Sequence, residues 1–175
     1  MRAVLGAVVI AVVLALPASA ASLDPKGLVL HQIDVPTGYL LDESQSLVLP
    51  GDFARSGRLT GYYALYRNTS PPYWRTIVSV SHVFRRPEGA RTFLRMLDRE
   101  ARRESTGSLE RRSVDIGAQG WIYTVRAPDR ITVVVWRHGR VVAQVNCSCS
   151  KTSGKQALAL ALARKQQRRI AAALR

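Results

Sequence analysis

Two hydrophobic patterns divide most of the chain beyond its first twenty residues into strands and helices. Apolar and β-branched residues that alternate or run together predict strands. The predicted strands span 39–41, 59–67, 77–84, 109–114, 121–126, 131–136 and 141–145. Apolar residues at helical spacing predict a helix from Pro87 to about Arg103 and another that begins after Ser153, a potential N-cap. A short helix is expected to begin at Asp24-Pro25 and to end before Pro36.

The segment 131–146 is the most informative about the fold. His138-Gly139 is predicted as a two-residue turn, which would place Trp136 opposite Val141. Both faces of the resulting hairpin are mainly apolar, whereas a hairpin buried on one side alternates apolar with polar residues. We therefore expect this hairpin to lie at the centre of its sheet, with both faces covered.

The two longer helices can provide those covers, because each carries an apolar stripe. The stripes consist of Ala90, Phe93, Leu94, Leu97 and Ala101 in the first helix, and of Leu160, Ala163, Gln167, Ile170 and Leu174 in the second. Together these pieces predict an α+β fold. It has an antiparallel sheet of about five to seven strands, a central hairpin, and helices packed on one or both faces.

The first twenty residues differ from the rest of the chain. Arg2 precedes an unbroken apolar run, Ala3 to Leu16, and then the small residues of Pro17-Ala18-Ser19-Ala20, a sequence typical of a secretory signal peptide. The run has about 14 residues, fewer than the roughly 20 that cross a bilayer as a helix. No Cys lies near the cleavage point to receive a lipid. We therefore predict that residues 1–20 are removed and that 21–175 form a single secreted or extracytoplasmic α+β domain without a transmembrane anchor.

The formal net charge of +14 has two competing explanations, an anionic partner or a compositional bias toward arginine. The arginines at helical spacing are Arg91, Arg95, Arg99 and Arg102 in the first long helix, and Arg164 and Arg168 in the last. Guanidinium groups suit phosphate and carboxylate oxygens, so these positions form a hypothetical site for an anionic polymer or lipid surface. Export disfavours nucleic acid as the physiological partner. An arginine-rich composition is also typical of GC-rich genomes, and charged helix faces usually only contact water.

Aromatic residues gather in and before the loop at 68–74. They are Tyr62, Tyr63, Tyr66, Tyr73 and Trp74. Aromatic rings on loops offer a large contact area with a polar edge, which makes these residues a hypothetical contact surface for an extracellular or envelope ligand. The alternative is that the rings fold over one end of the sheet as peripheral core.

The two cysteines lie in Cys147-Ser148-Cys149. An even number of cysteines in an exported protein indicates a disulfide. Extended residues two positions apart are about 6.6 Å apart at Cα, near the upper limit for such a bond, so the chain would have to turn there. The alternatives are two small residues facing the core, or a strained bond with a thiol-disulfide role. Two thiols do not complete a tetrahedral metal site, and no metal is predicted.

The remaining residues show no catalytic or cofactor motif. The histidines His31, His82 and His138 lack zinc-binding spacing, and the serines lack a nucleophile elbow. The sequence therefore favours a non-enzymatic domain without a cofactor, with a ligand-binding or accessory role in the bacterial envelope.

Four short segments carry a resemblance to known proteins. They are Val35-Pro36-Thr37-Gly38-Tyr39, the helix entry from Phe84 to Ala90, Ile116-Gly117, and the hairpin from Val135 to Ala143. In this order they resemble an uncharacterised family of small secreted proteins and lipoproteins from high-GC bacteria. The layout is also similar to extracellular sensor-type domains and to PsbP-like sandwich domains. The resemblance implies a binding, sensing or accessory role in the envelope and assigns no catalytic residue.

Overall fold

The computed structural model describes residues 23–48, 56–68, 75–104, 109–125, 130–149 and 155–175. The predicted signal peptide, the predicted cap Ser153, and Tyr73 and Trp74 of the predicted contact surface lie outside these ranges.

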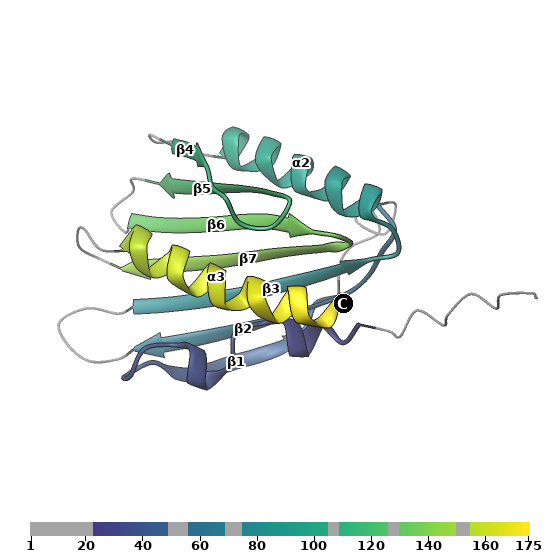
Figure 1. Cartoon of the computed structure of the whole chain (residues 1–175). Coiled ribbons are helices and arrows are strands. Elements are labelled where there is room, and N and C mark those ends of the chain that lie inside the picture. Colours follow the sequence, from purple (N-terminus) through teal and green to yellow (C-terminus); the bar gives the residue numbers. More distant parts are fainter. Residues whose placement is uncertain (1–22, 49–55, 69–74, 105–108, 126–129, 150–154) are drawn as a thin grey trace, which may run out of the picture.

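The described residues form one antiparallel sheet of seven strands (Figure 1). In chain order the strands are β1 (Leu40–Ser46), β2 (Arg58–Asn68), β3 (Arg75–Phe84), β4 (Leu109–Ser113), β5 (Gln119–Val125), β6 (Arg130–His138) and β7 (Val141–Cys149). Their order across the sheet is β1-β2-β3-β7-β6-β5-β4. The hairpin of β6 and β7 therefore lies inside the sheet, as predicted, and β7 is joined to β3 by a pairing that the sequence did not reveal.

The helices cover both faces of this sheet (Figure 1). Helix α3 (Lys155–Ala173) and the 3₁₀ turn η1 (Pro25–Leu28) lie on one face, here called the α3 face, and α2 (Pro87–Glu104) lies on the other, the α2 face. The core of the α3 face includes Ile77, Val134, Trp136, Val145, Leu162 and Ile170. The core of the α2 face includes Phe84, Phe93, Leu94, Tyr123, Val135 and Val142. The predicted α+β fold is confirmed.

The turn of the central hairpin is displaced by one residue from its predicted position. Gly139 and Arg140 form the turn, so Trp136 pairs with Ala143 and not with Val141. The reason is that Gly139 has a φ of +54°, and a positive φ at the first turn position alone is the pattern of a type II′ turn. The pairing shifts by two residues, and side chains alternate with period two, so every residue keeps the face that was predicted.

The N-terminal part differs most from expectation. The predicted short helix is two separate 3₁₀ turns, η1 and η2 (Gln32–Asp34). Leu28 and Val29 are buried, whereas Ile33 is 85% exposed. The predicted strand at 39–41 continues as β1 to Ser46, and all of its residues are exposed. An edge strand without a buried face shows no alternation in its sequence, and for this reason its length was underestimated.

Candidate functional site

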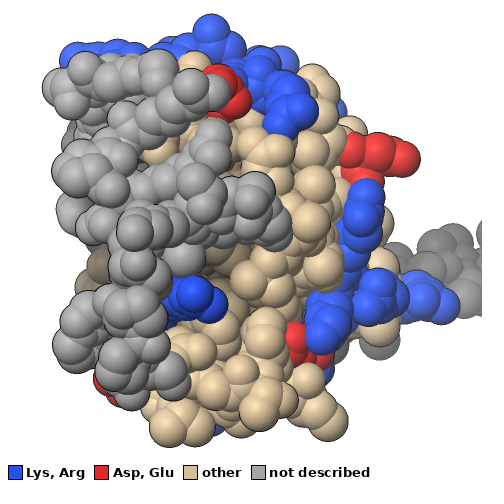
Figure 2. All heavy atoms as spheres, turned by 90° about the vertical axis from the view of Figure 1, so that its left-hand side faces the viewer, with Lys and Arg blue, Asp and Glu red and all other residues tan. Residues whose placement is uncertain are grey.

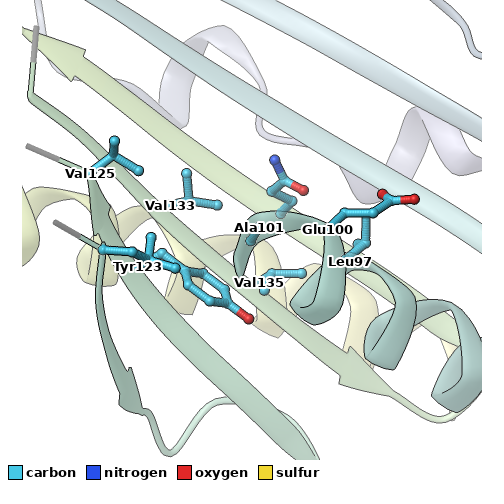
Figure 3. A pocket seen from close by; sticks show the side chains of 9 residues that line it. Leu97, Glu100, Ala101, Tyr123, Val125, Val133 and Val135 are labelled. Carbon is cyan, nitrogen blue, oxygen red and sulfur yellow. The ribbon is translucent and has the colours of Figure 1, made fainter. Parts of the chain in front are cut away.

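Helix α2 covers its sheet face unevenly and leaves a pocket beneath its second half. Phe93 and Leu94 are buried, whereas Leu97 and Ala101, farther along the helix, are only half-buried. The pocket, here called the α2 pocket, has a volume of about 320 Å³ and is shown in Figure 3. Its lining consists of Leu97, Glu100, Ala101, Leu109, Tyr123, Val125, Val133, Val135 and Gln144. The volume falls in the range of pockets that hold small molecules.

The α2 pocket has mainly carbon walls and a few polar groups. Glu100 is half-buried at the helix, and Gln144 rises from β7 in the sheet. The Gln144 Nε2 donates a hydrogen bond to Asn146 Oδ1 at 2.7 Å. The side-chain amide oxygen of Gln144 and the Glu100 carboxylate can both accept hydrogen bonds. Apolar walls with a small number of acceptors suit a molecule that is largely hydrocarbon and carries a donor or a positive charge.

A polar cluster beside the pocket holds one of its walls in place. Asp98 accepts hydrogen bonds from Tyr123 Oη at 2.6 Å and Arg111 Nε at 2.8 Å, and from Arg102 at 3.3 Å. Partial burial raises the pKa of Asp98, but these three hydrogen bonds outweigh it, so the pKa lies below its usual value. Burial and the bond to Asp98 raise the pKa of Tyr123. The Arg111 guanidinium also lies 4.5 Å from the ring centroid of Trp121.

The predicted arginine site is divided between the two faces of the sheet. Arg91, Arg95, Arg99 and Arg102 are exposed on α2, whereas Arg164 and Arg168 are exposed on α3, which covers the opposite face. Figure 2 shows Lys and Arg atoms along the upper and right-hand edges of the molecule, with mostly other residues between them. The structure does not bring the two sets together, and anion binding by either one stays a prediction.

The predicted aromatic surface is divided as well. Tyr62 and Tyr66 point to the α3 face of β2, and Tyr63, between them in sequence, points to the other face. Tyr66 is only 2% exposed, and its hydroxyl donates to the Leu30 carbonyl at 2.6 Å. Burial, followed by the nearby Asp34, raises the pKa of Tyr66 to about 12. Tyr66 therefore belongs mostly to the core, and a contact role for it and for the other tyrosines stays a prediction.

Tyr62 and Tyr66 line a second hollow, here called the N-terminal groove. It has a volume of about 240 Å³ and lies between the N-terminal turns and strands β1 and β2. Its lining consists of Lys26, Val29, Leu30, His31, Gln32, Leu41, Ser44, Tyr62, Ala64 and Tyr66. Sequence reasoning singled out the two tyrosines but missed both hollows, because each is assembled from segments that are distant in sequence.

The cysteine pair lies in an unbroken stretch of β7. Cys147 is buried and pairs with Ile77 on one side and Thr132 on the other, and the strand continues to Cys149 without a turn. The backbone thus keeps the extended spacing, at which the Cα–Cα distance between the two cysteines is near the upper limit for a disulfide. A thiol-disulfide role stays a prediction. Within the described residues, no group of three or more His, Cys, Asp or Glu could hold a metal ion.

The fold and its hollows define an α+β domain with helices on both faces of an antiparallel sheet. The chain matches no protein-family model and no curated protein. Among solved structures it is similar to the extracellular domain of PknH from Mycobacterium tuberculosis, with a TM-score of 0.57 and 11% identity. The match covers 82% of this chain and 94% of that domain. It shows a common fold, in agreement with the extracellular sensor-type layout that the sequence resembles. In the described residues, which begin at 23, no helix is long and apolar enough to span a membrane.

Proposed function

We propose that this chain acts outside the cytoplasm as a non-enzymatic domain that binds a small, largely apolar ligand in the α2 pocket. Such a domain would serve a binding or accessory role in the bacterial envelope. The observation that carries the proposal is the pocket itself, whose hydrocarbon walls come from α2 and three strands. Burying apolar ligand surface against such walls contributes about 25 cal/mol per Å².

Three further observations support the proposal: two favour a site outside the cytoplasm, and one favours a ligand with a positive or donor group. The N-terminal sequence is typical of a signal peptide, and the similar solved structure is an extracellular domain. Glu100 is the only charged residue among the described residues of the lining. It therefore favours a cationic group on the ligand, although the protein as a whole is strongly basic.

The proposal is tested with decyltrimethylammonium, a ten-carbon chain with a cationic head, titrated into the purified protein by calorimetry. The net charge of +14 opposes non-specific binding of this probe. We expect saturable binding that Ala101→Phe weakens about tenfold or more, because the ring fills the pocket; tenfold corresponds to about 1.4 kcal/mol.

The matched control is Ala161→Phe, the same change on the exposed side of α3, which should leave the affinity unchanged. Equal affinities of the two variants, or no binding to the unaltered protein, would contradict a ligand site beneath α2. Compounds that co-purify with the unaltered protein and not with Ala101→Phe would identify the natural ligand.

A further inference from the structure

We propose that the N-terminal groove is a separate binding site for a small amphiphile with one anionic head group, such as an alkyl carboxylate. The groove lies on the α3 face of the sheet, opposite the α2 pocket. The two hollows share no lining residue, so this inference does not rest on the function proposed above.

The floor of the groove includes a small residue between two large ones. Tyr62, Ala64 and Tyr66 alternate along β2 and therefore point to the same face. Val29 and Leu30 of the N-terminal segment belong to the same lining, and Val29, Leu30 and Ala64 are all almost fully buried. The floor is therefore apolar, as the hydrocarbon part of an amphiphile requires.

Hydrogen bonds hold the walls of the groove in place before a ligand arrives. The N-terminal segment is attached to the sheet at Leu30, whose N–H donates to Ser79 Oγ at 2.9 Å and whose carbonyl accepts from Tyr66. The Gln32 amide donates to the Tyr39 carbonyl at 2.6 Å and accepts from the Leu41 N–H at 3.1 Å. A site that is already ordered loses less entropy on binding.

The polar groups of the groove suit a negative charge. Lys26 and His31 lie in its lining, and the described lining residues include no Asp or Glu. Ser44 Oγ accepts a hydrogen bond from Tyr62 at 3.1 Å, which leaves the serine O–H able to donate to a ligand. The nearby Asp24 and Asp34 carboxylates accept hydrogen bonds from other groups, Asp24 from the Lys26 N–H, and Asp34 from Arg169 and the His31 N–H.

The inference is tested with decanoate, which has a ten-carbon chain like the probe of the α2 pocket but an anionic head. We expect decanoate to shift the NMR signals of Leu30, Tyr62 and Ala64. Lys26→Glu should weaken its binding about tenfold or more, the effect of losing a charge-assisted contact. Lys26 is exposed, so the variant is expected to fold.

The matched control is Arg164→Glu, which makes the same change in net charge at an exposed position of α3. If it weakens decanoate binding as much as Lys26→Glu does, attraction is due to overall charge and the inference is wrong. Ser44→Trp fills the groove from an exposed position and should abolish the shifts. Shifts at Leu97 and Val133 in place of those at Ala64 would also overturn the inference, since they would place decanoate in the α2 pocket.

Discussion

His82 is a titratable group enclosed by the core of the α2 face. It is 7% exposed, and its ring lies 4.8 Å from that of Phe93, centroid to centroid. Its Nδ1 has no hydrogen-bond partner among the described residues. Burial, with the positive charge of Arg58 as a second cause, lowers the pKa of His82 to about 3. The folded protein therefore holds this imidazole in its neutral form.

This burial makes stability depend on pH. Between about pH 6.5 and pH 3 the unfolded chain binds a proton at His82 that the folded chain does not bind, so the free energy of unfolding falls as the pH is lowered through this window. The slope from this residue approaches about 1.4 kcal/mol per pH unit. Urea unfolding at pH 5, 6 and 7 should show a slope that steepens toward this value near pH 5 in the unaltered protein, and a smaller slope in His82→Gln. The exposed His31→Gln should keep it, and the prediction is wrong if both variants retain the full slope.

At the scale of elements, Asp98 joins α2 to the two strands at one edge of the sheet. Its partners Arg111 and Tyr123 belong to β4 and β5. Without the carboxylate, the hydroxyl of the buried Tyr123 and the half-buried Arg111 guanidinium lose this hydrogen-bond acceptor. The attachment of this helix therefore depends on polar contacts as well as on its apolar stripe.

Replacing this carboxylate should destabilise the protein more than replacing another acid of the same helix. We expect Asp98→Ala to lower the free energy of unfolding by about 1.5–3 kcal/mol, the range for hydrogen bonds to charged groups. Glu100→Ala, two residues along α2, should change it by less than about 0.5 kcal/mol. Urea denaturation at neutral pH measures both. Similar values for the two variants would show that the Asp98 contacts contribute little.

Most elements could be predicted from the sequence because burial leaves a period in it. The prediction that both faces of the β6–β7 hairpin are buried is confirmed, since Val134 and Val135 point to opposite cores. The predicted length of the exposed strand β1 was too short, because the strand has no buried face that would leave a pattern in the sequence. Other contacts join residues that are far apart in the chain, namely the pairing of β3 with β7 and the hydrogen bonds of Asp98. Local sequence patterns do not predict such contacts. The pockets depend on the same distant contacts.

At the scale of the whole molecule, two cores share one sheet. Trp136 belongs to the core of the α3 face and donates from Nε1 to Gln167 at 2.7 Å, whereas Trp121 belongs to the core of the α2 face. The strands between them contribute alternate residues to both cores. Loss of either core would expose one face of the same strands, so we expect both to unfold together.

Tryptophan fluorescence can report on each core separately. Two variants, each with Trp74 and one other tryptophan replaced by Phe, would retain only Trp121 or only Trp136. Leu162→Ala, which alters the core of the α3 face alone, should destabilise both variants by the same amount, about 2–5 kcal/mol. A change in the midpoint seen only by Trp136 would mean that the two cores unfold independently.

The Gln32 amide contacts one end of the outermost strand on this side of the sheet, β1. Strand β1 is the outermost strand on its side, its residues are exposed, and Leu40 and Leu41 are large apolar side chains. The amide makes a donor and an acceptor bond to the Tyr39 carbonyl and the Leu41 N–H, as the backbone of an added strand would. One side chain thus satisfies a backbone acceptor and a backbone donor that an added strand would need in order to extend the sheet at this end.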